Sequence, residues 1–504
     1  MANENLLLKS MTSGDSRTQN NCVTNSTTSN DCVDLFFTIG AMRSNRKNKD
    51  AMSKLITMFD RAFDENPLIT MKILFWSRDI RGGAGERDVF RQLWKHITSV
   101  DFTAKMLKAN RTSGYELFKM NMENIPEYGR WDDLFALMNS DETTPVEDWI
   151  VNYIVNTLKN ENDQSRNLLA KWLPRTGGKT SASKKLIANK VRHAMKMNPA
   201  EYRKFLVSLT KVVETAMCQK EWGRIDYEHV PSVAMSRYMK AFGKNDGTRF
   251  TEYVQSVQKG EKKMNASAVY PYDVFRSLRN GGEKAANAMW SSLPNYLEGN
   301  TESIMPMVDV SGSMSSRISG EISAMDVSVS LGVYVAERME GAFKDHFITF
   351  TSQPTLQRLT GTLSDRIRQI QGPVGFDTNI EAAFKMLLNS AVKGNVPQEH
   401  MPAKILIISD MEFNDSCISG HSVSAMEKIK VLYEQAGYKR PDIIFWKVNI
   451  LTMENCPVKY DEQGTALISG FSPSILTSLL GGDMTPVNIM LKAVNAPRYD
   501  RVKA

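Results

Sequence analysis

The sequence predicts two domains, an α-helical repeat domain followed by an α/β domain with a mostly parallel sheet. Three observations support this fold class. The length of 504 residues exceeds what one hydrophobic core usually organises. Apolar residues recur at helical spacing over 34–295, whereas short apolar runs alternate with amphipathic stretches over 300–504. The polar segment 281–301 separates the two patterns and is the expected domain boundary.

The helical domain is predicted from the spacing of its apolar residues. Between Val146 and Leu158 the apolar positions fall at offsets 0, 3, 4, 7, 8 and 12, which is one face of an α-helix. Further helices are expected over 51–63, 67–78, 89–97, 184–196, 201–217 and 247–257. Many helices joined by short loops favour a HEAT-like repeat structure. A helical bundle is the alternative.

The α/β domain is predicted from alternating strand and helix patterns. Strand-like runs cover 304–308, 347–350, 405–409 and 443–450, and helical patterns cover 321–340, 378–391 and 423–436. Alternation of this kind indicates a sheet with helices on both faces. Ligands of such sheets bind beyond the carboxyl ends of the strands.

A candidate metal site directly follows the first of these runs, at Asp309-Val310-Ser311-Gly312-Ser313. One carboxylate and two hydroxyls at positions i, i+2 and i+4 offer three hard oxygen ligands from a single turn, which suits Mg²⁺ or another divalent cation. Gly312 permits the tight turn between the serines. The alternative is an Asp-Ser turn whose hydroxyls cap a helix that begins near Ser315.

Two later loops carry further oxygen ligands. Thr378 follows Gly375-Phe376-Asp377 at the start of a predicted helix, and Asp410 follows the run 405–409. This order resembles the metal-ion-dependent adhesion site of von Willebrand factor A domains, which have a Rossmann-like fold. The matching positions are Asp309, Ser311, Ser313, Thr378 and Asp410, with Asp377 and Glu412 as outer-shell candidates. A folded site that binds no metal is the alternative.

Binding is expected rather than catalysis. No Ser-His-Asp arrangement accompanies the candidate metal site. The segment Gly177-Gly178-Lys179-Thr180 is similar to the end of a phosphate-binding loop, but Leu173 occupies the position of the required first glycine. In A domains, the metal leaves a coordination position for the carboxylate of a protein partner. The sequence therefore predicts no enzyme.

Positive charge is concentrated in the helical half of the chain. Residues 1–300 contain 44 Lys and Arg against 34 Asp and Glu, and 151–200 contain ten against two. Such a block favours polyanionic partners. The candidate RNA-binding residues are Lys171, Arg175, Lys179, Lys184, Lys185, Arg192 and Lys196. An ordinary solvated face is the alternative.

The composition is typical of a cytoplasmic globular protein. Hydrophobic residues make up 42% and charged residues 24% of the chain. The five cysteines form no Cys-x-x-Cys pair, which fits a reducing compartment. No apolar run approaches the roughly 18 residues of a membrane span, so no membrane partner is expected. The Ser/Thr/Asn-rich composition of 10–32 predicts a disordered arm over 1–33, without the features of a signal peptide.

Several segments resemble an uncharacterised family that combines a helical domain with an A domain. They include Asp79–Arg87, Gly129–Leu134, Lys171–Arg175, Trp222–Met235, Tyr270–Asp273 and Ser469–Pro473, within a similarity that covers roughly 34–495. That family in turn is similar to the Ro autoantigen proteins, whose TROVE domain is a ring of helical repeats closed by an A domain. The resemblance implies a ribonucleoprotein that binds small structured RNAs or single-stranded RNA ends. The rival hypothesis is an interaction scaffold whose metal captures a partner's carboxylate.

Overall fold

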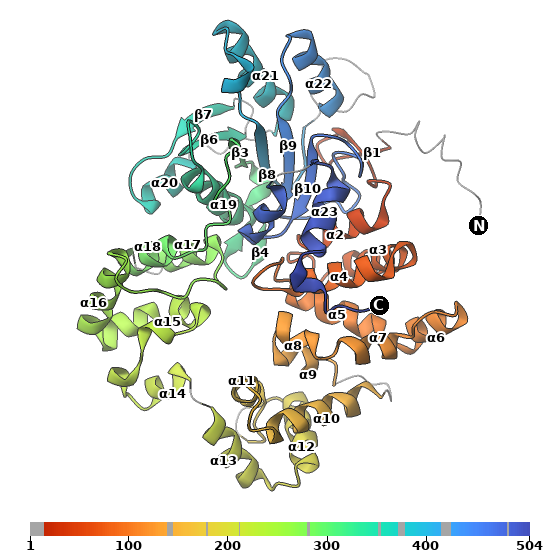
Figure 1. The fold of residues 1–504 in the computed structure, drawn as a ribbon, viewed down its shortest axis with the longest axis vertical. Helices are drawn as coiled ribbons and strands as arrows, with labels where there is room; N and C mark the ends of the chain where they lie inside the picture. Colours follow the sequence, from red (N-terminus) through yellow and green to blue (C-terminus); the bar gives the residue numbers. More distant parts are fainter. Residues whose placement is uncertain are drawn as a thin grey trace.

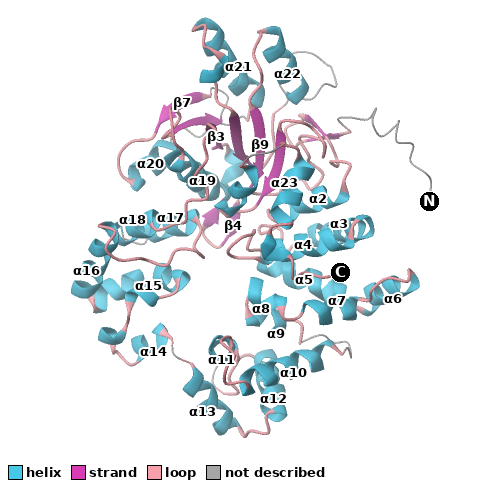
Figure 2. Cartoon of the chain, viewed as in Figure 1, coloured by secondary structure: helices cyan, strands magenta, loops and turns pink. Residues whose placement is uncertain are grey.

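The computed structural model describes residues 15–138, 145–177, 180–210, 212–279, 283–350, 354–370, 378–414, 425–480 and 483–504. Helices account for most of the chain up to Ser291, and a six-stranded sheet with flanking helices follows (Figures 1 and 2). The predicted combination of a helical and an α/β part is confirmed. In this part of the chain, no helix has both the length and the apolar character needed to cross a bilayer.

Seventeen helices are described in the N-terminal part. They are α2 (Asp31–Ile39), α3 (Lys49–Glu65), α4 (Pro67–Arg78), α5 (Arg87–Ile97), α6 (Val100–Lys108), α7 (Gly114–Asn121), α8 (Asn124–Tyr128), α9 (Trp131–Phe135), α10 (Val146–Lys159), α11 (Arg166–Trp172), α12 (Ala182–Ala194), α13 (Pro199–Leu209), α14 (Val213–Cys218), α15 (Ser232–Asn245), α16 (Gly247–Gln258), α17 (Pro271–Arg279) and α18 (Glu283–Ser291). In α10 the predicted apolar face is buried at Val146, Ile150, Ile154 and Leu158. Local signals set the boundaries: Asn66 caps α4 by accepting from the Ile69 amide, and Pro67 follows at the first helical position.

The sheet has the strand order β10-β9-β8-β3-β6-β7. Its strands are β3 (Ile304–Asp309), β6 (His346–Phe350), β7 (Thr355–Arg358), β8 (Lys404–Ser409), β9 (Asp442–Lys447) and β10 (Thr465–Ser469). Only β7 runs antiparallel to its neighbour, at the sheet edge. Every residue of β3 and β8 is buried, because helices cover both faces of the sheet. The flanking helices are α19 (Ala324–Arg338), α20 (Leu363–Ile370), α21 (Ile380–Lys393), α22 (Ala425–Gln435) and α23 (Pro486–Val494).

The helical domain begins and ends on the α/β domain (Figure 1). At its start, α2 packs against β10 and α23, and the Ser469 hydroxyl donates to the Phe36 carbonyl oxygen at 3.1 Å. At its end, α17 packs against α19, and the Trp290 indole donates to Glu337 at 3.0 Å. The path of the helices therefore leaves the α/β domain and returns to it.

The N-terminal segment corrects the expectation of a disordered arm. Residues 1–14 lie outside the described residues, but 15–30 form the short strands β1 (Ser16–Arg17) and β2 (Val23–Thr24) and pack against the α/β domain. The Thr18 hydroxyl donates to the Phe413 carbonyl oxygen at 2.6 Å, and Asn25 pairs with Cys456 through the backbone. The polar side chains that suggested disorder hydrogen-bond to distant backbone groups instead, which composition alone does not reveal.

Candidate functional site

Two acidic residues meet where the strand order of the sheet reverses. Asp309 ends β3, Asp410 follows β8, and these strands are parallel neighbours with Val308 opposite Ile408. The chain passes from β3 to β6 on one side and later to β8 on the other, so a crevice is expected between the carboxyl ends of β3 and β8. The Ser328 hydroxyl of α19 donates to the Ile408 carbonyl oxygen at 3.0 Å and holds these strand ends together.

The loop after β3 arranges its oxygen atoms around Asp309. The carboxylate accepts the Ser311 amide at 2.9 Å and the Ser409 hydroxyl at 2.5 Å. The Ser311 and Ser313 hydroxyls lie 3.0 Å apart. A 3-10 turn follows at Gly312–Ser315, but no side-chain hydrogen bond caps it, so helix capping does not account for the two serines. Gly312 is exposed and Ser313 half-buried, which makes them the outer side of the site.

The two carboxylates are buried together, and their negative charges are not fully compensated by hydrogen bonds. Asp309 and Asp410 are both 0% exposed. Burial raises the pKa of Asp309, and burial together with the charge of Asp309 raises the pKa of Asp410 to about 7. One oxygen of Asp410, Oδ2, is buried without a hydrogen-bond partner. Such a pair is costly unless a cation or a proton neutralises it, so the residues present fit a divalent cation.

The side chains of the other residues that the sequence suggested for the metal site, Thr378 and Glu412, hydrogen-bond to groups other than the two carboxylates. The Thr378 hydroxyl donates to the Glu412 carbonyl oxygen at 2.7 Å, so it contacts the loop that carries Asp410 and not the carboxylates themselves. The Glu412 carboxylate accepts the amides of Gln19 at 2.7 Å and Thr452 at 3.1 Å, and thereby anchors the N-terminal segment. Asp377 lies outside the described residues. Within the described ranges, no group of three or more His, Cys, Asp or Glu is arranged for a metal, so serine hydroxyls would have to complete the ligand set.

The basic residues predicted to bind RNA divide into two groups. Arg175 donates to the carbonyl oxygens of Ala170 at 3.1 Å and Leu173 at 2.8 Å, and Arg192 donates to that of Met197 at 2.9 Å. These two arginines therefore stabilise local turns. The lysines are more accessible to a ligand: Lys184 and Lys196 are exposed, and Lys171 and Lys185 are half-buried. Lys179 lies outside the described residues.

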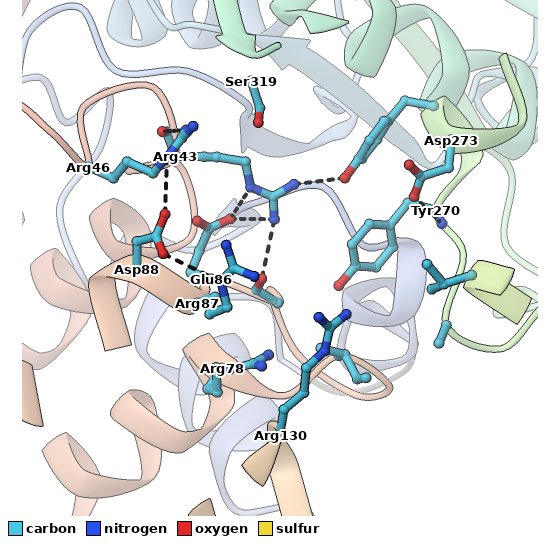
Figure 3. Close-up of a pocket in the computed structure, with 15 residues that line it drawn as sticks. Arg43, Arg46, Arg78, Glu86, Arg87, Asp88, Arg130, Tyr270, Asp273 and Ser319 are labelled. Carbon is cyan, nitrogen blue, oxygen red and sulfur yellow. Dashed lines mark hydrogen bonds and ion pairs between the residues drawn. The ribbon is translucent and has the colours of Figure 1, made fainter. Parts of the chain in front are cut away.

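A second candidate site, which the sequence reasoning did not single out, is a cavity of about 270 Å³ lined by arginines (Figure 3). The arginines are Arg43, Arg46, Arg78, Arg87 and Arg130. Two of them lie between α2 and α3, one ends α4, one begins α5 and one precedes α9. The lining also includes Tyr270, just before α17, and Tyr272 within it. The signal was present in the sequence: the Asp79–Arg87, Gly129–Leu134 and Tyr270–Asp273 segments, distant along the chain, all contribute to this one cavity.

Comparisons with known proteins identify the family. Residues 18–171 and 165–299 match the model of a family described as domain of unknown function DUF2828, and residues 303–496 match domain of unknown function DUF7788. Uncharacterized protein L728 of Acanthamoeba polyphaga mimivirus is 25% identical over 521 residues, covering 94% of this chain and 86% of the viral protein. The crystal structure of the Deinococcus radiodurans RO (RSR) protein aligns with 90% of this chain and 93% of its own, at 11% identity and a TM-score of 0.34. Because the DUF2828 model matches more than half of the chain, the protein belongs to the DUF2828 family.

Proposed function

We propose that this chain is a non-enzymatic, Ro-like RNA-binding protein. In this proposal, the helical domain is a HEAT-like ring that holds small structured RNA or single-stranded RNA ends. The α/β domain is of the von Willebrand factor A type and closes the ring. The observation that carries the proposal is the uncompensated positive charge on α12 and its flanks.

The lysines around α12 are available to a polyanion. Lys184 and Lys196 are exposed, and within the described residues neither they nor Lys185 form an ion pair. Lys190 differs, because it pairs with Glu147. Lysines that neutralise phosphates supply most of the sequence-independent affinity for RNA, and log affinity falls by roughly 0.7 per contact for each tenfold rise in salt. RNA binding by this surface should therefore weaken steeply with ionic strength.

The first experiment is to extract and sequence nucleic acid that co-purifies with the intact protein. The Lys184→Glu/Lys185→Glu variant should lose this RNA. The matched control is Lys393→Glu/Lys430→Glu, which reverses two exposed lysines of α21 and α22 and should retain it. Absence of retained RNA together with no gel shift at low salt, or an affinity independent of salt, would contradict the proposal.

A divalent cation, Mg²⁺ in the simplest case, is part of the proposal. Asp309, Ser311, Ser313 and Asp410 would hold it, with Thr378 as the fifth candidate. The buried, unpartnered Oδ2 of Asp410 supports this assignment. When bound, the cation supplies a Lewis acid that can accept an oxygen from outside the chain. That oxygen would reach the cation from the side of Gly312 and Ser313, because these two residues form the outer side of the site.

The unpartnered Oδ2 of Asp410 also favours a second candidate function. In this alternative, the protein is a metal-dependent scaffold that captures the carboxylate of a protein partner. The two functions respond differently to Asp309→Ala. This change should abolish metal-dependent partner capture, but it should leave RNA binding by the helical domain largely intact. A turnover assay on RNA with nuclease-free protein tests whether the protein is instead an enzyme.

The proposal places the protein in the cytoplasm. Among the described residues, Cys32, Cys218 and Cys456 are free, and Cys32 and Cys456 are buried. Free thiols are stable in a reducing compartment. Localisation of a fluorescent fusion would test this assignment.

A further inference from the structure

The arginine-lined cavity brings together parts of the chain that are far apart in sequence. Arg78 and Arg87 flank the loop between α4 and α5, Arg130 precedes α9, and Tyr270 precedes α17. Ser319, at the end of β4 (Arg317–Ser319), adds a contribution from the α/β domain. The cavity therefore lies where the two ends of the helical domain meet the α/β domain.

The charges that line the cavity do not balance. Five arginines face three carboxylates, those of Glu86, Asp88 and Asp273. Each of these acids already has a cationic partner: Arg43 lies 2.7 Å from Glu86, Arg46 lies 3.2 Å from Asp88, and Arg276, outside the lining, lies 3.2 Å from Asp273. Arg78 is paired with Asp133, a buried carboxylate outside the lining, at 2.8 Å. Arg87 and Arg130 are therefore the two arginines of the lining whose positive charge is left in excess.

Arg130 is the arginine of the lining for which no ion pair is found among the described residues. Its guanidinium lies 5.1 Å above the ring of Trp172. Burial and the nearby charges of Arg78 and Arg87 lower its pKa, although the charges of Asp132 and Asp133 act in the opposite direction. Arg87 is 45% exposed, and its one ion pair in the described part is a 3.4 Å contact with the adjacent Asp88. Neither Arg87 nor Arg130 therefore has a strong ion pair with a described residue, and the charge of Arg87 acts on Arg130.

The Tyr270 hydroxyl supplies a third polar group. It is buried and has no hydrogen-bond partner. In Figure 3, the hydroxyl of Tyr270 and the guanidinium of Arg130 both point into the middle of the cavity. The ring of Tyr270 is held close to Gly85, where a Cβ atom would lie 2.1 Å from the hydroxyl oxygen. A buried hydroxyl without a partner is costly, so an acceptor group of a ligand at this position would be stabilised.

We propose that this cavity binds a phosphate monoester group, held by the guanidinium groups of Arg130 and Arg87 and by the hydroxyl of Tyr270. A phosphate monoester carries close to two negative charges at neutral pH and offers three acceptor oxygens, which matches the excess charge and the three donors. Planar guanidinium groups bind phosphate oxygens in pairs, and this geometry favours phosphate over a single-charge anion.

The volume limits the ligand to the size of a nucleotide or smaller. About 270 Å³ lies just below the range of roughly 300–1,000 Å³ that is common for small-molecule sites. The phosphate could belong to a free nucleoside monophosphate or to the phosphorylated end of an RNA chain, because both present the same group. This inference does not rest on RNA binding by α12, since a different set of residues forms the cavity.

The test uses the intact protein and measures binding of inorganic phosphate, uridine monophosphate and uridine by calorimetry at low salt. Arg130→Gln and Tyr270→Phe are the variants, and Arg368→Gln, which changes a 75% exposed arginine of α20, is the control. Loss of one charge-assisted hydrogen bond should weaken binding of the phosphate compounds by about tenfold or more. The control should bind as the wild type does, and uridine should not bind.

Tyr270→Phe separates a binding role from a structural role. Because the hydroxyl has no partner in the free protein, its removal should leave the melting temperature unchanged or slightly higher while it weakens phosphate binding. Uridine oligonucleotides with and without a 5′-phosphate distinguish the two sources of the group: a preference for the phosphorylated oligonucleotide over uridine monophosphate identifies an RNA end. If no phosphorylated probe binds, or if Arg130→Gln and Tyr270→Phe bind as tightly as Arg368→Gln, the inference is wrong.

Discussion

The Arg43 guanidinium donates a 2.7 Å hydrogen bond to the hydroxyl of Tyr272, which lies 229 positions further along the chain. Arg43 lies between α2 and α3, and Tyr272 lies in α17, so this bond joins the two ends of the helical domain. The same guanidinium pairs with Glu86 and lies 4.3 Å from the centre of the Phe471 ring, just after β10. Arg43 therefore links the first helices, the last helices and the sheet.

Tyr272→Phe should weaken the contact between the two ends of the helical domain and lower the stability of the protein. Hydrogen bonds to a charged group contribute about 1.5–3 kcal/mol, and we expect a loss of that size in the free energy of unfolding. Hydrogen exchange of α2 and α17 should increase together. The control is Tyr115→Phe, because the Tyr115 hydroxyl makes no hydrogen bond with another described residue. In a double mutant with Arg43→Met, the two effects should be less than additive, and strict additivity would show that the bond contributes nothing.

Asp133→Asn should be strongly destabilising. Asp133 is fully buried and accepts from two arginines, with contacts of 2.8 Å to Arg78 and 2.7 Å to Arg91. Removal of this carboxylate leaves the buried Arg78 uncompensated, which typically costs about 3–5 kcal/mol. Urea denaturation would measure the effect. The adjacent Asp132→Asn is the control: its carboxylate is partly exposed, so its loss should cost about 1 kcal/mol or less.

Asp410→Asn should stabilise the metal-free protein. Asp309 and Asp410 repel each other in a buried site, and the substitution removes one of the two charges. The same change should abolish the stabilisation by Mg²⁺, which for a single site reaches about 2.7 kcal/mol at 100 times the dissociation constant. Thermal unfolding in chelator and in Mg²⁺ measures both effects, with Asp461→Asn, an exposed acid, as the control. A wild-type protein that gains no stability from any divalent cation would argue against the metal site.

Lys447→Met should change how stability depends on pH. Lys447 ends β9 and is almost fully buried, and burial lowers its pKa, although the charges of Cys456, Glu412, Asp410 and Asp34 act in the opposite direction. The unfolded chain then holds more protons than the folded one between the lowered pKa and the ordinary value of about 10.4, so stability should rise with pH across that window.

Urea unfolding at several alkaline pH values would measure this slope. The slope should be less positive in the Lys447→Met variant than in the wild type, because methionine does not titrate and the contribution of Lys447 is lost. Lys393→Met changes an exposed lysine of α21 and should retain the wild-type slope. Equal slopes in the wild type and Lys447→Met would mean that Lys447 titrates normally in the folded protein.

The sequence alone determined the local structure, including the loop that begins at Asp309. The apolar face of α10 and the buried runs of β3 and β8 follow from residue periodicity, because burial of one face leaves a local pattern. The position of Asp309 at the end of a strand follows in the same way. These features involve residues close together in the chain, so short-range spacing is enough to predict them.

Only the tertiary structure decided which distant residues meet. The N-terminal segment was expected to be disordered, yet Thr18 and Asn25 bond to the α/β domain. Nothing in the sequence indicated that Arg175, a candidate RNA-binding residue, donates to the carbonyl groups of Ala170 and Leu173. The cavity at Arg130 and Tyr270 combines segments about 140 residues apart. The physical reason is that a polar or charged side chain carries no periodic signal for its partner, which is chosen by the packing of whole helices and sheets against one another.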